Sequence, residues 1–220
     1  PNRTSGKTDS GTQQCGAIKG RSTKHALVDI LHYWHQALDN SESVRVIFID
    51  YAKAFDHVDH SILVRKLYNF NVPQFLIRWL CSFSTNRMQR VKLSEYFSEW
   101  LNLKGSMPQG TWLGPLVFIL LINDLSSHCG MHKFVDDVTL TEVIKKNDYS
   151  NISAHLNNVV EWSDLNLMNI NVAKTKELLL GRIIKEPPPN IFVGSIVIER
   201  VPSFRLLGIH IDNNLKWTSH

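Results

Sequence analysis

At 220 residues, with 43% hydrophobic and 20% charged side chains, the chain has the composition of a folded protein of one domain or two small lobes. Three scattered cysteines without a CxxC spacing argue against a disulfide framework and a thiolate zinc site, and the longest apolar run, 112–122, is too short to span a bilayer. The net charge of +4 is mild, but cations cluster at 87–92, 145–146 and 174–176, which suits either a phosphate backbone as partner or an ordinary solvated surface.

A polar N-terminal segment precedes the first predicted element. Residues 1–15 contain no apolar core, so we expect a flexible or truncated end rather than a signal peptide. Ser22 or Thr23 is a favourable N-cap, and the apolar residues that follow at helical spacing predict an amphipathic helix that ends near Asp39. The apolar, β-branched run 44–49 then predicts a strand.

The middle of the chain is predicted to contain three helices and a hairpin. Helices are expected from about Ser61 and from Pro73, because proline favours the first turn of a helix. Alternating polar and apolar residues over 87–103 are typical of a β-hairpin. From Gly114 the apolar residues recur at helical spacing and predict a helix, buried on one side, as far as Asn123.

The C-terminal part opens with KFVDDVTL, residues 133–140, in which two β-rich arms flank an acidic pair. This pattern predicts a hairpin with its turn at the aspartates. The remaining predicted elements are a helix over about 152–165, strands over 177–180, 196–201 and 204–211, and a stiff proline connector at 187–189. This order of elements predicts an α+β fold, an antiparallel sheet with helices on one face.

Three carboxylates end or interrupt the predicted strands. Asp50 follows strand 44–49, and Asp136 and Asp137 lie at the predicted hairpin turn. A buried carboxylate is costly unless a cation faces it, and Mg²⁺ prefers oxygen ligands of this kind. If the strand ends meet, the three acids form a site for two Mg²⁺ ions such as polymerases use. The alternative is that the Asp136–Asp137 pair is an ordinary polar turn.

Six segments stand in a specific order along the chain. They are AIKGRST (17–23), FIDYAKAFDHVDH (48–60), GSMPQGTWLGPLVFILLINDL (105–125), KFVDDVTL (133–140), NLMNINVAKTKELLLG (166–181) and FRLLGIHIDNNLKW (204–217). Each is weakly specific by itself, but together they resemble the reverse transcriptase domain of non-LTR retrotransposons. This is the LINE-type group that includes jockey-like and chicken-repeat-like elements, and the resemblance covers nearly the whole chain.

The resemblance implies a polymerase right-hand fold, with the palm and part of the fingers in one domain over 16–217 and the thumb absent. It implies an RNA-directed DNA polymerase in which two Mg²⁺ ions, with Mn²⁺ as a substitute, align a primer 3′-hydroxyl with the incoming nucleotide. The implied partners are an RNA template, a DNA primer and deoxynucleoside triphosphates, and no membrane. The expected location is an intracellular, reducing compartment, and the nucleus if the chain acts as its relatives do.

The resemblance also implies roles for individual residues. Asp50 and Asp136 would bridge both metals, and Asp137 would be the less directly coordinated second acid. The backbone carbonyl of Tyr51 would bind the metal on the triphosphate. Phe55 would collide with a ribose 2′-hydroxyl and so select deoxyribonucleotides, although it could also be a simple core aromatic.

Further implied roles lie elsewhere in the matching motifs. Lys174 would protonate the departing pyrophosphate, unless it is only a surface lysine. Gln109 and Gly110 would begin the loop and helix that hold the nucleotide and template. The remaining assignments are Lys19 and Arg21 as triphosphate contacts, and Leu207 and Gly208 as the turn of a hairpin that positions the primer end.

Some positions depart from the family pattern. Met107 and Thr111 stand where Val and Ser are usual, and Val135 stands where Ala is usual. These changes keep apolarity or a hydroxyl, so no loss of function is expected. Cys15 lies in a segment where relatives carry Gly-Phe, which affects local side-chain contacts rather than catalysis.

Two alternatives stay open. The segment DHVDH brings His57 and His60 close to two acids and could be the metal cluster of a metallohydrolase, although no further His or Cys motif completes such a site. The chain could also be an inactive, truncated remnant that only binds nucleic acid. A chain without a thumb is expected to release its template–primer quickly and to show weak, poorly processive activity.

Overall fold

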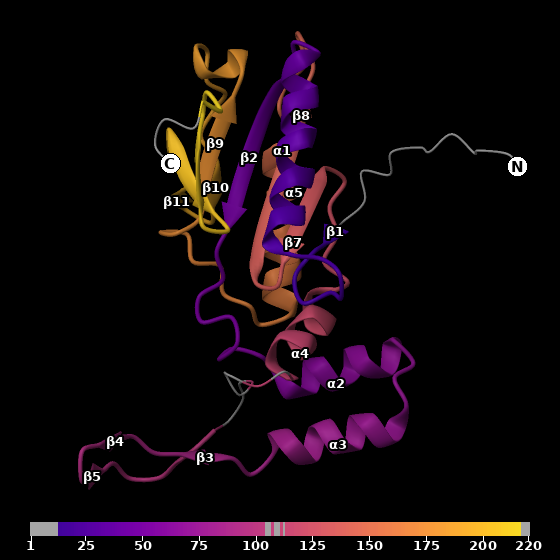
Figure 1. Cartoon of the computed structure of the whole chain (residues 1–220), viewed down its shortest axis with the longest axis vertical. Coiled ribbons are helices and arrows are strands. Elements are labelled where there is room, and N and C mark those ends of the chain that lie inside the picture. Colours follow the sequence, from indigo (N-terminus) through magenta and orange to yellow (C-terminus); the bar gives the residue numbers. More distant parts are fainter. Residues whose placement is uncertain (1–12, 104–106, 108–110, 112, 217–220) are drawn as a thin grey trace, which may run out of the picture.

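The centre of the fold is a six-stranded sheet with the strand order β1-β7-β8-β2-β9-β12 (Figure 1). The computed structural model describes residues 13–103, 107, 111 and 113–216. In the order of the sheet, the strands are β1 (Gln13–Gln14), β7 (Gly130–Phe134), β8 (Asp137–Ile144), β2 (Ser43–Ile49), β9 (Lys176–Leu180) and β12 (Glu199–Arg200). A central sheet with helices confirms the α+β prediction in its coarse form.

The sheet differs from the predicted one in two respects. The inner strands β7, β8, β2 and β9 are antiparallel, but β1 and β12 run parallel to their neighbours. Helices also cover both faces of the sheet, so the prediction of helices on one face is wrong. All seven residues of β2 are buried, with Val44, Val46 and Phe48 in one apolar cluster and Ile47 and Ile49 in the other. A strand buried on both faces lacks the polar–apolar alternation of a half-buried strand, and in VRVIFI only Arg45, which pairs with Glu177, interrupts the apolar run.

The helix α1 (Thr23–Asp39) covers one face of the sheet, as its apolar spacing predicts. Its Trp34 is fully buried, and the indole N–H donates to the hydroxyl of Thr141 on β8 at 3.1 Å. Ser22 occupies the N-cap position, but its hydroxyl lies 2.9 Å from the ring Nδ1 of His25 and makes no capping bond to a backbone N–H. The predicted cap position is therefore correct and the expected capping bond is absent.

The opposite face is covered by α4 (Leu113–Ile122) and α5 (Ile152–Leu165), and α2 (His60–Asn69) packs against α4. These helices agree with the periodicity of the sequence. Within the described part of the chain, no helix is both long enough and apolar enough to cross a membrane.

Two buried lysines satisfy carbonyls at the C-terminal end of α4 and just beyond it. Lys133 donates from Nζ to the carbonyls of Ile122 and Leu125 at 2.9 and 3.0 Å. Lys66 donates to the carbonyl of Leu121 at 2.6 Å. A cation at this end of a helix pairs with carbonyls that lack intrahelical partners and offsets the helix dipole. The two lysines thereby join α2 and β7 to α4.

A projecting β-ribbon follows α3 (Gln74–Ser84), which packs beside α2 (Figure 1). Figure 1 shows the ribbon extending away from the sheet, beyond the two helices. It consists of β3 (Met88–Gln89) paired with β6 (Leu101–Asn102), and of β4 (Lys92–Leu93) paired with β5 (Tyr96–Phe97). The hairpin predicted for 87–103 is confirmed.

The C-terminal strands are shorter than predicted. After β9 come the 3₁₀-helix η1 (Arg182–Ile184) and two hairpins, β10 (Phe192–Val193) with β11 (Ile196–Val197), and β13 (Ser203–Leu206) with β14 (Ile209–Asp212). The predicted strand 196–201 divides between β11 and the sheet strand β12, and the segment 204–211 folds back on itself. Alternation of apolar residues alone does not locate such reversals.

A buried ion-pair network anchors the proline connector to the sheet. Glu177 on β9 is fully buried and accepts from Arg45 at 2.5 Å and from Arg200 at 2.8 Å. The same two guanidinium groups donate to the carbonyls of Pro189 at 2.6 Å and Pro188 at 3.0 Å. The buried charges are therefore paired and hydrogen-bonded, as low-dielectric surroundings require.

Candidate active site

The strand register brings the predicted acids together. Ile49, the last residue of β2, pairs with Val138 on β8. Asp50 follows Ile49, and Asp137 precedes Val138, so the two acids lie at the same end of adjacent antiparallel strands. Asp136 occupies the β7–β8 turn beside them, as the hairpin prediction expected.

The backbone of Asp50 is held by the segment that leads into β9. Asn171 donates its N–H to the Asp50 carbonyl at 2.8 Å, and Asp50 donates its own N–H to the hydroxyl of Thr175 at 3.3 Å. That hydroxyl donates to the Asn171 carbonyl at 2.9 Å, and Thr175 is fully buried. These bonds place Lys174, which lies between the two residues, beside Asp50.

The turn that carries Asp136 has a strained backbone. Val135 has a φ of +59°, which is rare for a β-branched residue. The side-chain oxygen of Gln14 accepts from the N–H groups of Val135 and Gly16 at 3.3 and 2.8 Å. A Cβ at position 16 would lie 2.5 Å from the nitrogen of Val135, so glycine is required there. Strain of this kind often accompanies functional sites, and here the neighbouring strand β1 holds it in place.

Five of the residues singled out from the sequence line one hollow. Its volume is about 490 Å³, enough for a small ligand. The described residues that line it are Asp50, Tyr51, Ala52, Lys53, Ala54, Phe55, Asp136, Asn171 and Lys174. The hollow therefore combines two carboxylates, two lysines and two aromatic residues.

The carboxylates of the site repel one another. Partial burial of the carboxylate, together with repulsion from the Asp136 and Asp50 carboxylates, raises the pKa of Asp137 to about 6. Burial also raises the pKa of Asp136, with a further rise from Asp50 and a partial offset from its own backbone N–H. A divalent cation would relieve this repulsion, so the residues present fit one. In the described ranges, however, no group of three Asp, Glu, His or Cys side chains is arranged to hold one ion, so ligation by all three aspartates stays a prediction.

The substitution Asp137→Asn is expected to stabilise the metal-free protein at pH 7 and not at pH 4. The folded pKa of about 6 exceeds the unfolded value of 3.8, so the folded state binds more protons between these pH values. Stability of the wild type is therefore expected to fall as the pH rises through this window. Because solvent screens this exposed group, the gain is about 1 kcal/mol at most, or about 2–4 °C in Tm.

Thermal unfolding in a chelating buffer at pH 4 and pH 7 would measure this difference. Asp148→Asn, at an exposed residue in the loop beyond the other end of β8, is the matched control and is expected to have no such pH dependence. An equal gain from Asp137→Asn at both pH values would contradict the prediction.

Phe55 contacts both the core and the hollow. Its ring centroid lies 5.1 Å from that of the fully buried Phe118, and its carbonyl accepts from the N–H of Met107 at 2.9 Å. The ring is half-buried and also lines the hollow that contains Asp50 and Asp136. The two interpretations of Phe55 from the sequence are therefore compatible, because packing against Phe118 fixes a ring that faces the site.

The two lysines beside Thr175 have different surroundings. Lys176 donates to a carboxylate oxygen of Glu199 at 2.6 Å and so joins β9 to β12. Lys174 is exposed and lines the hollow. Only Lys174 of this basic cluster is therefore available to a ligand in the hollow.

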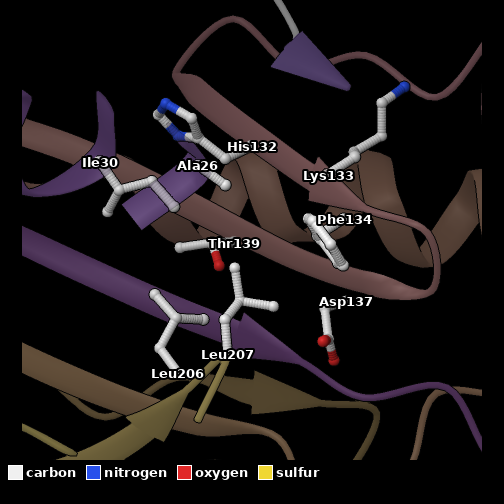
Figure 2. A pocket seen from close by; sticks show the side chains of 9 residues that line it. All are labelled: Ala26, Ile30, His132, Lys133, Phe134, Asp137, Thr139, Leu206 and Leu207. Atoms are coloured by element: carbon white, nitrogen blue, oxygen red, sulfur yellow. The ribbon is translucent and has the colours of Figure 1, made fainter. Parts of the chain in front are cut away.

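The predicted primer-positioning turn lies close to Asp137. Leu207 and Gly208 connect β13 to β14 with φ values of +46° and +92°, the signs expected for a tight hairpin turn. Figure 2 shows Leu206 and Leu207 facing Thr139 and Asp137 across a small hollow of about 10 Å³. Gly208 is exposed at the tip.

Other predicted residues lie away from the hollow. Lys19 and Arg21 are exposed and are not among the described residues that line it. Arg21 instead lies 3.8 Å from a carboxylate oxygen of Asp29. Gln109 and Gly110 lie outside the described residues.

The segment DHVDH, residues 56–60, leads into α2. Asp59 caps this helix by accepting from the N–H of Ile62 at 2.9 Å, and His60 is the first helical residue. In the described chain, no metal-binding group involves His57 or His60.

Several residues of the site were missed by sequence reasoning. Lys53 lines the hollow as a second cation, and its position between Asp50 and Phe55 could have indicated it. Gln14 and Thr175 act through hydrogen bonds to distant backbone, for which no local pattern exists.

Comparison with known proteins supports a polymerase relationship. The family model described as "Reverse transcriptase (RNA-dependent DNA polymerase)" matches residues 5–211. The probable RNA-directed DNA polymerase from transposon X-element of Drosophila melanogaster is 24% identical over 216 residues, which cover 94% of this chain and 24% of that protein. The polymerase from the mobile element jockey of the same species is 23% identical over 219 residues, with the same two coverages. The chain thus spans about a quarter of the length of these relatives.

Solved structures with a similar fold include two telomerases. The truncated apo telomerase from Candida tropicalis has a TM-score of 0.57 and 15% identity over 87% of this chain and 38% of that one. The Candida albicans telomerase, in complex with a fragment of telomeric RNA, has a TM-score of 0.59 and 13% identity over 90% of this chain and 34% of that one. At these identities the similarity is one of fold.

Proposed function

Because the chain belongs to the reverse transcriptase (RNA-dependent DNA polymerase) family, we propose that it carries the polymerase site of a non-LTR, LINE-type retrotransposon. The reaction is addition of a deoxynucleotide to a primer 3′-hydroxyl on an RNA template. The observation that carries the proposal is the hollow where Asp50, Asp136, Phe55 and Lys174 meet. The central sheet is the palm, and α2 and α3 belong to the fingers.

The acids have the chemistry for holding metal ions. Asp50 and Asp136 would bind two Mg²⁺ ions, with the Tyr51 carbonyl as a further ligand and Asp137 as the supporting acid. Bound metal supplies an activated primer hydroxyl and stabilises charge on the leaving pyrophosphate. The mutual repulsion of these carboxylates supports the proposal, because a bound cation would relieve it at a pH at which they are ionised.

The other residues of the hollow bind and orient the nucleotide. Lys174 donates a proton to the departing pyrophosphate from beside Asp50, and the backbone clamp at Asn171 and Thr175 fixes that position. Lys53 adds a second positive charge for the triphosphate. Phe55 occupies the place where a ribose 2′-hydroxyl would lie.

The proposed partners follow from this reaction. They are an RNA template, a DNA primer and deoxynucleoside triphosphates, and the proposed location is the nucleus. The telomerase from Candida albicans, which shares the fold, is described in complex with RNA.

Primer extension tests the proposed function. The 220-residue chain is expected to add one deoxynucleotide to a DNA primer annealed to RNA when Mg²⁺ is present, and to add none when the template or the metal is omitted. Because the assay measures the addition of one nucleotide, a chain that releases its template–primer quickly can still give a positive result. Binding of the primed template without any addition would contradict the proposal and favour a protein that only binds nucleic acid.

A further inference from the structure

One stretch of the chain carries its net positive charge. Residues 60–103 contain six Lys or Arg and two Asp or Glu, which are Glu95 and Glu99. The other 176 residues contain 18 Lys or Arg and 18 Asp or Glu, so the net charge of this stretch, +4, equals that of the chain. The stretch forms α2, α3 and the ribbon, and of its cations Lys66 is buried and paired with Asp124. A surface with an excess of cations attracts a polyanion.

An aromatic stripe runs along one side of α3. Phe75, Trp79 and Phe83 are spaced by four residues and therefore lie on the same side of the helix. The rings of Trp79 and Phe83 stack at 5.9 Å, while Phe75 and Trp79 are 69% and 55% exposed. The core side of α3 is formed instead by Ile77 and Leu80. These exposed rings are not needed for the fold, which indicates a surface that meets a partner.

The cations of the ribbon lie over aromatic rings. Arg87 lies 5.2 Å from the ring centroid of Phe83, which joins the stripe of α3 to the ribbon. Arg90 lies 3.9 Å from the ring of Phe97 and 4.6 Å from that of Trp100. Among the described residues, neither arginine forms an ion pair. Their charge is therefore not neutralised within the described chain.

The base of the ribbon leads directly to the candidate active site. The N–H of Leu103 donates to the carbonyl of Arg87 at 2.9 Å, which closes the ribbon. Four residues later, the N–H of Met107 donates to the carbonyl of Phe55, whose ring lines the hollow. A nucleic-acid strand that leaves the hollow on this side would meet the ribbon.

We infer that this surface binds single-stranded RNA, the part of the template that is not yet paired. The aromatic–basic surface, as we call it, consists of Trp79, Phe83, Arg87, Arg90, Phe97 and Trp100. Bases stack on exposed rings and phosphates pair with cations, a combination that binds single strands with little regard to sequence. A neutral apolar partner would match the rings but would gain nothing from the excess of cations. The inference rests on the proposed function only where it identifies the bound strand as the unpaired template. Binding of single-stranded RNA by this surface does not depend on that function.

Loss of stacking is the first test. The double substitution Trp79→Leu with Trp100→Leu removes two exposed rings and keeps their apolarity, so the fold is expected to survive. Fluorescence anisotropy would measure binding of a labelled single-stranded RNA of about 16 nucleotides, without Mg²⁺ or nucleotides. Affinity is expected to fall about tenfold or more. Tyr149→Leu is the matched control, because Tyr149 is 92% exposed in a distant loop, and its affinity should equal that of the wild type.

Salt dependence is the second test. Each cation that meets a phosphate of a single strand contributes about 0.7 to the slope of log affinity against log salt. Arg87→Ala with Arg90→Ala is therefore expected to reduce that slope by about 1.4. Lys185→Ala, which removes an exposed cation outside the surface, is expected to leave the slope unchanged. A surface that docks apolar protein would show no change of slope in either variant.

The outcomes separate this inference from the proposed function. If the chain extends primers and both double variants bind RNA as tightly as the wild type, the inference is overturned and the polymerase assignment stays intact. RNA binding that depends on this surface in a chain without extension activity upholds the inference and overturns the polymerase assignment. If the wild-type chain does not bind single-stranded RNA, the inference is overturned. It is also overturned if the wild type is a dimer and the double tryptophan variant is a monomer with unchanged affinity for RNA.

Discussion

Asp136→Asn is expected to lower the rate of single-nucleotide addition about a thousandfold or more, which corresponds to about 4 kcal/mol of transition-state stabilisation. Asparagine keeps the size of the side chain but removes the negative charge that a bridging metal ligand needs. In the structure, Asp136 lines the hollow with Asp50, at the tip of the β7–β8 turn. Primer extension under single-turnover conditions, with saturating Mg²⁺, measures the change.

Unfolding is not expected to explain this loss. Burial and the Asp50 carboxylate raise the pKa of Asp136, so its charge is a cost to the metal-free fold. The variant should therefore unfold at the temperature of the wild type or above it. Asp148→Asn, with the same chemical change in an exposed loop, should retain full activity. Equal rates for Asp136→Asn and the wild type would refute the assignment of Asp136.

Phe55→Val is expected to relax discrimination against ribonucleotides about a hundredfold, equivalent to about 3 kcal/mol. The smaller side chain removes the ring that would collide with a 2′-hydroxyl in the hollow. The ratio of kcat/KM for a deoxynucleotide and the matching ribonucleotide measures the effect. This ratio does not depend on the fraction of protein that is folded.

Two control variants separate selectivity from core stability. Phe55→Tyr keeps the ring and should retain the discrimination. Phe118→Leu removes the aromatic contact at 5.1 Å from the buried side, where the ring does not line the hollow, and should cost stability while discrimination persists. If Phe55→Val leaves the ratio unchanged, Phe55 is only a core residue.

Local features of the fold could be predicted from the sequence. The helix over 152–165 and the hairpin turn at Asp136 occur where periodicity and turn chemistry indicated them. These features depend on side chains a few residues apart, so a short window of sequence contains their cause. The division of 196–201 between two sheets could not be predicted in this way, because it depends on pairing partners elsewhere in the chain.

The candidate site could be predicted in part for the same reason. Asp50 and Asp136 are marked by their position at the ends of apolar strands, and motif order related them to one family. The residues that hold the backbone of these acids in place have no such signal in the sequence. Gln14 reaches Val135 across 121 positions of the chain, and Thr175 reaches Asp50 across 125. No periodicity connects residues that far apart.

By itself, the sequence determined the order of the elements, the acids at the strand ends and the family to which the chain belongs. The tertiary structure decided that helices cover both faces of the sheet, that Lys174 and not Lys176 lines the hollow, and that Lys53 joins it. It also decided that the rings of α3 and the ribbon stay exposed and carry arginines. The physical reason is that propensity and spacing act over a few residues, whereas burial and register result from the whole core.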